Sequence, residues 1–217
     1  MSQRNFRELL EAQWACGNFV CVGLDSELAK IPEAVVNRLS ARETTFEFNR
    51  RIVDATKDLV CAYKPNIAFY EAEGGSGLTA LRETIVHIHA AAPEVPVILD
   101  AKRADIGNTN AGYVKMAFEM LGADAITVHP YLGSEALHPF LERADKGIFV
   151  LCRTSNPGAG EFQDLWWPIS STHPLADRLG KLSLTLYEYV ADQVATKWNK
   201  LNNCGLVVGA TYSAELG

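Results

Sequence analysis

The sequence lacks a long apolar run, an excess of basic residues and a paired cysteine motif. Its apolar runs, such as Gly147–Cys152, have the length of a β-strand, whereas a membrane-spanning helix needs about 20 apolar residues. In the 217 residues, 26 Asp and Glu outnumber 20 Lys and Arg, which leaves a net charge of -6. Because nucleic acids and anionic membranes bind basic surfaces, we expect neither as a partner.

The five cysteines are odd in number, show no C-x-x-C spacing and mostly fall inside apolar runs. This usage is typical of buried free thiols. The first residues, MSQRNFRE, are charged and contain no apolar core of a signal peptide, so we expect a cytoplasmic protein. The first apolar run is not followed by the G-x-G-x-x-G glycine pattern, which argues against a dinucleotide-binding fold.

What the sequence does have is a regular alternation of apolar strand-like runs with helices. The composition, 48% hydrophobic and 21% charged, is that of a globular protein, and we expect a single domain over residues 1–217. Strands are predicted at residues 18–25, 59–64, 95–99, 123–129, 147–152 and 204–210. This alternation predicts a parallel α/β architecture.

Polar residues stand at the ends of successive predicted strands, among them Asp25, Lys64, Asp100 and His129. In (β/α)8 barrels the functional residues come from the carboxyl ends of several strands. The pattern therefore favours a (β/α)8 TIM barrel over an open sheet, with about six of the eight strands present in this chain.

The segments between the strands are predicted from helical spacing and from turn residues. We expect a helix over 32–39, a helix capped by Thr44 and Thr45, a Gly-rich link over 73–77, a loop over 154–174 and a long helix over 175–201. His87 and His89, two positions apart on a predicted helix, are expected at the surface.

The third strand ends abruptly in charge, at Asp100, Lys102 and Asp105. Since side chains alternate along a strand, Asp100 and Lys102 are predicted to share a face, with Lys64 opposite them. Unit charges ~4 Å apart attract by about 4 kcal/mol at an effective dielectric constant near 20, enough to hold the geometry. A lysine held between carboxylates suits a general acid, although a solvated rim of charge is the alternative interpretation.

Five motifs, in this order, carry a resemblance to a known family. They are VGLD at 22–25, YKPNIAFY at 63–70, DAKRADIGNT at 100–109, CRTSNPG at 152–158 and VVGAT at 207–211. Together they are similar to the motifs of orotidine 5'-phosphate decarboxylases, in the longer bacterial subgroup. The resemblance implies decarboxylation of orotidine 5'-monophosphate to uridine 5'-monophosphate, the last step of pyrimidine synthesis, without a metal or an organic cofactor.

The resemblance also implies a role for each matching residue. Lys102 would protonate C6 as carbon dioxide leaves, and Asp100 would face the substrate carboxylate. Lys64 and Asp25 would hold the ribose hydroxyls, and Ser155 would hydrogen-bond the pyrimidine. The family is homodimeric, so Asp105, Ile106 and Thr109 would reach into the site of the partner subunit.

Two features depart from the family pattern. Ser26 stands where the family usually has proline, and Ala104 stands where it usually has glycine; both are small residues. The family's phosphate-binding Gln, Gly and Arg have no counterpart up to Gly217. Binding energy from the phosphate helps to assemble such a site, so these 217 residues alone are expected to be C-terminally incomplete and unstable or inactive.

Two alternative functions stay open from the sequence. One is a magnesium-dependent sugar-phosphate decarboxylase or aldolase of the same superfamily, which shares the D-x-K-x-x-D pattern. The segments 106–109 and 154–158 favour the pyrimidine enzyme over it. The other alternative is a non-catalytic remnant that only binds nucleotides or dimerises.

Overall fold

The computed structural model describes residues 4–36 and 40–211. Its strands are Val20–Leu24 (β1), Val60–Pro65 (β2), Ile98–Arg103 (β3), Ala125–Val128 (β4), Gly147–Arg153 (β5), Trp166–Pro168 (β6), Ser183–Thr185 (β7) and Cys204–Val208 (β8). Its α-helices are Phe6–Ala15 (α1), Glu33–Val36 (α2), Ala41–Thr56 (α3), Ile67–Glu71 (α4), Gly74–Ala91 (α5), Gly107–Val114 (α6), Gly133–Leu141 (α7), Gly160–Gln163 (α8), Pro174–Leu179 (α9) and Leu186–Gln193 (α10).

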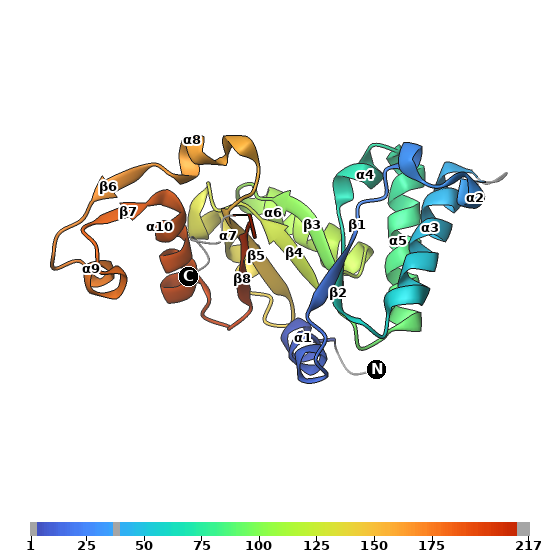
Figure 1. Ribbon diagram of the computed structural model, residues 1–217, viewed down its shortest axis with the longest axis horizontal. Coiled ribbons are helices and arrows are strands. Elements are labelled where there is room, and N and C mark those ends of the chain that lie inside the picture. The colour runs from blue at the N-terminus through green and yellow to red at the C-terminus, as the bar shows by residue number, and fades with distance from the viewer. Residues whose placement is uncertain (1–3, 37–39, 212–217) are drawn as a thin grey trace.

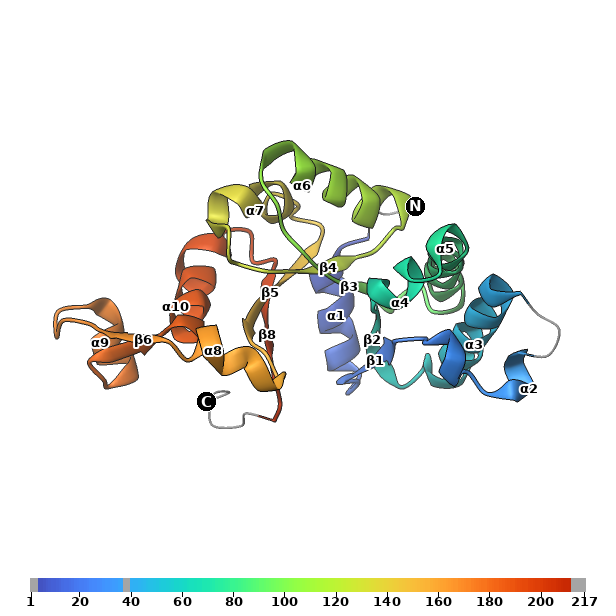
Figure 2. The ribbon, with the colours of Figure 1, turned by 90° about the horizontal axis from the view of Figure 1, so that it is seen from above.

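Six of the strands run parallel in one series. β1 pairs with β2, and β3, β4, β5 and β8 pair in that order. The bridges Tyr63–Val97 and Asn66–Asp100 join β2 to β3. Within the described ranges β8 and β1 are not paired with each other, and Figure 2 shows them as the two outer strands of the series. The expected parallel α/β architecture is confirmed, with six successive strands in barrel order.

The first helix closes the amino ends of the strands (Figure 1). Phe6 of α1 is 6% exposed and belongs to a small apolar cluster with residues of β2, β3, β4 and β5. Its ring meets that of Phe149 edge-on, with centroids 5.6 Å apart. Gly147 lies against the ring of Phe6, because a Cβ added at this glycine would stand 2.3 Å from Phe6 Cδ1. A small apolar core therefore joins α1 to the strands at this end.

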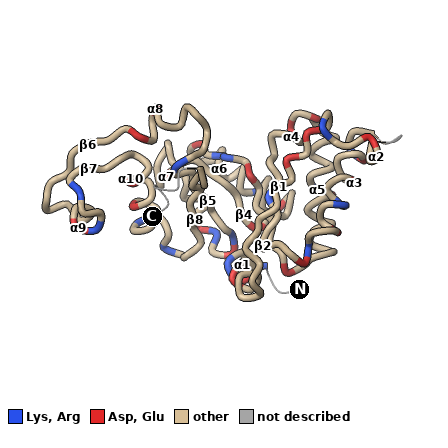
Figure 3. The backbone as a smooth tube through the Cα atoms, in the orientation of Figure 1, with Lys and Arg blue, Asp and Glu red and all other residues tan. Residues whose placement is uncertain are grey.

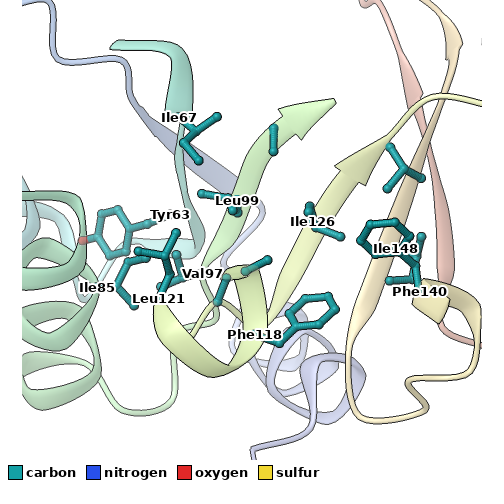
Figure 4. Packing of buried hydrophobic residues seen from close by; sticks show 14 of the residues in the cluster. Tyr63, Ile67, Ile85, Val97, Leu99, Phe118, Leu121, Ile126, Phe140 and Ile148 are labelled. Carbon is teal, nitrogen blue, oxygen red and sulfur yellow. The ribbon is translucent and has the colours of Figure 1, made fainter. Parts of the chain in front are cut away.

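A larger apolar core lies between the strands and the outer helices (Figure 4). Leu99 and Ile126 of the central strands are fully buried there, as are Tyr63 of β2 and Ile85 of α5. Full burial of such side chains contributes about 1.5–3 kcal/mol each. Because the central strands are buried on both faces, their sequences are continuous apolar runs rather than alternating apolar and polar residues.

The predicted helix over 175–201 is wrong. α9 ends at Leu179 because Gly180 takes the left-handed conformation, with φ of 64°, which ends a helix readily. The chain then forms β7, which pairs antiparallel with β6. Only after this hairpin does α10 begin, continuing as a π-helix over Val194–Trp198. The predicted loop over 154–174 accordingly contains α8 and β6.

Two predicted helix starts are also wrong. Ser40, not Thr44 or Thr45, caps α3, through a reciprocal capping box with Glu43. The Gly-rich link is helical, since α5 begins at Gly74. Gly77 has a packing reason to be there, because a Cβ would come 2.1 Å from the carbonyl oxygen of Tyr70. Of the helix predicted over 32–39, the structure has α2, and residues 37–39 lie outside the described residues.

The cysteine and histidine expectations hold only in part. Cys61 and Cys152 are buried thiols, as expected, whereas Cys16 and Cys21 are exposed. Cys21 lies on the outer strand β1, most of whose residues are exposed. His87 and His89 are half-buried rather than at the surface, because each contacts an aspartate of another segment.

Charged residues of both signs are spread over the molecule. Figure 3 shows Lys and Arg interspersed with Asp and Glu over both halves of the chain. In the described part of the chain, none of the helices has the length and apolarity needed to cross a bilayer.

Candidate active site

The carboxyl end of β3 holds a buried carboxylate between two lysines. Asp100 is 8% exposed, and its Oδ1 accepts a hydrogen bond of 2.7 Å from Lys102 Nζ. Its other oxygen, Oδ2, lies 3.2 Å from Nζ of Lys64 on β2. The predicted grouping of these three residues is confirmed. Charge-assisted hydrogen bonds of this kind are about twice as strong as neutral ones.

Simple strand alternation is not what brings Lys102 to Asp100. Leu99 of β3 pairs with Ile126 of β4, and the next paired residues are Arg103 and Val128. Three residues of β3 thus lie opposite the single residue Thr127, and this mismatch is a β-bulge in β3. Lys102 has φ of 48°, a left-handed conformation that costs a non-glycine residue roughly 1–2 kcal/mol. The bulge, not the pleat, directs its side chain.

Thr127 holds this bulge, and sequence reasoning missed it. Its Oγ1 accepts the backbone N–H of Ala101 at 3.0 Å and that of Lys102 at 2.9 Å. The same hydroxyl donates to Asp100 Oδ1 at 2.9 Å. Thr127 is 3% exposed. The only signal in the sequence is its place two residues before the polar end of the fourth apolar run, which predicts no partner.

The surroundings of Asp100 favour its ionised form. Burial acts to raise the pKa of this carboxyl, but the hydrogen bond from Lys102, the charge of Lys64 and the hydrogen bond from Thr127 outweigh it. The net effect is a pKa below the ordinary value of an aspartate. At neutral pH the site therefore presents an anion fixed between two cationic side chains.

Asp25 stands at the end of the neighbouring strand, two residues after the partner of Lys64. Gly23 of β1 pairs with Lys64, and Asp25 follows β1 directly, with its side chain exposed. The residues on either side of it are anchored: the carbonyl of Leu24 accepts a 2.9 Å hydrogen bond from the buried hydroxyl of Tyr70, and Ser26 Oγ donates to Asn49. Asp25 is thus presented to solvent from a rigid backbone.

Asp105, Ile106 and Thr109 are not brought to this cluster. The Asp105 carboxylate accepts the N–H of Ile106 at 2.7 Å, and its own N–H donates to Asn110. Ile106 is 63% exposed, and Thr109 is exposed in the first turn of α6. The salt bridges found among the described residues include none from Asp105. Within one chain, Lys102 therefore has Asp100 as its carboxylate partner, not Asp105.

Ser155 lies exposed in the loop after β5. The end of β8 supports this loop, since Gly209 N–H donates to the Arg153 carbonyl at 2.7 Å. A Cβ at Gly209 would come 2.9 Å from Ser155 Cβ, so the two segments touch through the backbone of a glycine. Cys152, by contrast, is buried. Its thiol donates to the Tyr187 carbonyl at 3.2 Å, and burial raises the pKa of this thiol to about 11.

Over the described ranges, the His, Cys, Asp and Glu side chains do not gather in groups of three or more that could hold a metal ion. The site is built instead from lysine and aspartate side chains at the carboxyl ends of parallel strands. Ligands bind at this edge in α/β barrels, on loops and strand ends. The fold and the cluster define the class of a barrel-type enzyme, with a candidate site of fixed charges at its strand ends.

Residues 18–215 match the model of the orotidine 5'-phosphate decarboxylase / HUMPS family, and the chain belongs to this family. The orotidine 5'-phosphate decarboxylase of Herpetosiphon aurantiacus is 49% identical over 197 residues, covering 91% of this chain and 67% of that protein. The enzyme of the same name from Thermomicrobium roseum is 49% identical over 214 residues, covering 98% and 69%. The chain thus spans about two thirds of the length of these relatives.

Solved structures share the fold. The structure of Leishmania donovani OMP decarboxylase superposes with a TM-score of 0.80 at 39% identity, covering 98% of this chain and 73% of that one. Leishmania donovani UMP synthase gives a TM-score of 0.81 at 38% identity, covering 98% of this chain and 41% of that one. The (β/α)8 barrel class expected from the sequence is therefore confirmed.

Proposed function

We propose that this chain decarboxylates orotidine 5'-monophosphate to uridine 5'-monophosphate in pyrimidine synthesis. The observation that carries the proposal is the ionised Asp100 held between Lys64 and Lys102 at the strand ends, in a chain of the orotidine 5'-phosphate decarboxylase family. Close relatives of the chain bear the name of that enzyme.

The chemistry needs a fixed cation at one ring carbon. When the bond between C6 and the carboxylate breaks, carbon dioxide leaves and the electron pair stays on C6, where the ring delocalises it poorly. Lys102 stabilises this carbanion with its positive charge and then transfers a proton from Nζ to C6. An ammonium group already aimed by Asp100 needs no reorganisation during the step, which is where electrostatic catalysis gains most. The neutral amine regains its proton from water.

The remaining site residues are proposed to hold the nucleotide. Asp100 faces the substrate carboxylate, Lys64 and Asp25 bind the ribose hydroxyls, and Ser155 hydrogen-bonds the pyrimidine. Support comes from their placement: Lys64 and Asp25 lie on adjacent strand ends, and the Ser155 loop is backed by β8. Positioning of this kind converts binding energy into rate.

We also propose that two copies share their sites. The support is the state of Asp105, Ile106 and Thr109. Ile106 and Thr109 are exposed and Asp105 is half-buried, and among the described residues Lys102 forms its salt bridge with Asp100 and not with Asp105. A homodimer in which they reach the partner's site would give Lys102 its second carboxylate. The cytoplasmic location, and the absence of nucleic-acid partners and cofactors, stay predictions.

The decisive experiment compares the wild-type chain with Lys102→Ala. This proposal departs from the expectation that these 217 residues alone are unstable or inactive, and turnover by the wild type decides between the two. If the proposal holds, the wild type converts orotidine 5'-monophosphate to uridine 5'-monophosphate and carbon dioxide, both quantified. The variant should show no turnover while still binding uridine 5'-monophosphate by calorimetry. Lys200→Ala, an exposed lysine before β8, is the matched control and should retain activity. Turnover in Lys102→Ala at the wild-type rate would remove Lys102 from this role.

The same assay separates the alternatives. The family description also covers HUMPS, so magnesium-dependent activity on a ketose phosphate, without activity on orotidine 5'-monophosphate, would favour the sugar-phosphate enzyme. Binding of uridine 5'-monophosphate by a wild-type chain that turns nothing over would favour the non-catalytic alternative.

A further inference from the structure

The hydroxyl of Thr127 connects the backbone of β3 to the carboxylate of the charged site. Thr127 of β4 accepts the N–H groups of Ala101 and Lys102 and donates to Oδ1 of Asp100. Three hydrogen bonds use one donor and two acceptor sites, which is the full capacity of a hydroxyl. No part of Thr127 is needed to touch a substrate for this arrangement to hold.

The bulge depends on this hydroxyl. Lys102 is held in the left-handed region, a conformation that persists only where the surroundings over-determine it. On the far side of the bulge the ladder resumes, because the N–H of His129 donates to the carbonyl of Arg103 at 3.1 Å. Between Leu99 and Arg103 the N–H groups of Ala101 and Lys102 have Thr127 as their acceptor.

We propose that Thr127 is a positioning residue for the decarboxylation, which aims the Lys102 ammonium by fixing the β3 bulge and orienting the Asp100 carboxylate at once. This inference rests on the proposed function. Lys102 Nζ contacts the same Oδ1 of Asp100 that accepts the hydroxyl of Thr127. A change at Thr127 therefore moves both the backbone that carries the lysine and the carboxylate that holds its head.

The proposal has a signature in the pH dependence. The charged groups that face Asp100 are Lys64 from β2 and Lys102 from its own strand, with the neutral Thr127 from β4 and Asp25 on the strand beyond Lys64. Removing the hydroxyl takes away a hydrogen bond to the carboxylate while leaving both lysines. The pKa of Asp100 should then rise, since hydrogen bonds to an ionised form stabilise it.

The test compares Thr127→Val, which keeps the shape, with Thr127→Ser, which keeps the hydroxyl. We expect Thr127→Val to lower kcat by roughly 10- to 100-fold with little change in KM, as for a displaced catalytic group. The acid limb of its pH profile should move to higher pH, and Thr127→Ser should restore both. Thr56→Val, which removes another hydroxyl bonded to a carbonyl and to Tyr63, should leave kcat and the acid limb unchanged.

Two measurements keep the inference testable apart from the proposed function. Carboxyl NMR titration should give Asp100 a higher pKa in Thr127→Val than in the wild type, whether or not the chain turns over. The amides of Ala101 and Lys102 should exchange slowly in the wild type, a measurement that needs no variant to fold. A wild type with no turnover refutes the proposed function. An active wild type, with an equally active Thr127→Val and an unmoved acid limb, overturns the role of Thr127, as do fast-exchanging amides.

Discussion

Asp124 should make this protein sensitive to acid at the amino end of its strands. The residue precedes β4 and is fully buried. Arg4 donates to both of its carboxylate oxygens at 2.9 Å, and the N–H of Val97 donates to Oδ2 at 2.9 Å. His89 Nε2 lies 3.4 Å from the same oxygen. The carboxylate thus fastens the segment before α1 and helix α5 to the start of β3 and β4.

The size of the effect follows from the pKa of this carboxyl. Burial acts to raise it, but the contacts with His89 and Arg4 and the Val97 N–H outweigh burial and lower the pKa from 3.8 to about 2. Since a tenfold change in a protonation equilibrium is worth about 1.4 kcal/mol, the depressed pKa contributes about 2 kcal/mol to the free energy of unfolding. A carboxyl whose pKa is lower in the folded protein stabilises the fold at pH values above its pKa in the unfolded chain. The contribution of Asp124 is therefore fully present above about pH 4 and is lost as the pH falls towards about 2, with roughly half gone near pH 3.

Urea unfolding of the wild type and Asp124→Asn between pH 6 and pH 3 measures this contribution. The variant should be less stable at pH 6 by about 2–3 kcal/mol, at or below the usual cost of breaking a buried ion pair because Arg4 is partly exposed. The difference between the two proteins should shrink by about 1 kcal/mol at pH 3. Asp58→Asn, at an exposed carboxylate, should follow the wild type. A wild-type advantage over Asp124→Asn that stays constant over this range would refute the reasoning.

Two further predictions concern packing and buried polar groups. Gly147→Ala should cost about 1–3 kcal/mol in urea unfolding, because its Cβ would overlap the Phe6 ring and overpack the interior. Gly112→Ala, with open space around it in α6, is the control and should be neutral or stabilising by up to about 1 kcal/mol; equal effects of the two would refute the overlap. Tyr70→Phe should lose about 1–3 kcal/mol, since the buried carbonyl of Leu24 loses its donor; unchanged stability would contradict this.

The strand framework could be predicted because its signal is local. Each apolar run was recognisable by itself, and the polar residues at the run ends were placed on one edge by the rule that parallel strands share their direction. Lys64, Asp100 and Lys102 were therefore predicted to meet, and they do. The predicted reason was incomplete, since alternation was assumed where the structure has a bulge.

The helices show where local patterns fail. The apolar spacing from 175 to 201 is helical in period, yet Gly180 and the pairing of β6 with β7 interrupt it. An isolated short hairpin is marginal in water, so its strands carry no strong signal of their own. Here Trp167 of β6 rests on the Tyr189 ring of α10, with centroids 5.7 Å apart, and Leu184 of β7 is 1% exposed.

By itself, then, the sequence determined the parallel α/β class, the order of its strands and the motifs of its family, because periodicity and strand-end residues are properties of neighbouring positions. Only the tertiary structure decided which side chains hold the buried aspartates in place. Thr127 meets Asp100 across 27 positions of sequence, and Arg4 meets Asp124 across 120. Such contacts depend on how the strands lie side by side in the folded chain. Here the bulge of β3, which the Thr127 hydroxyl holds, positions Lys102, the lysine that the sequence motif had already indicated.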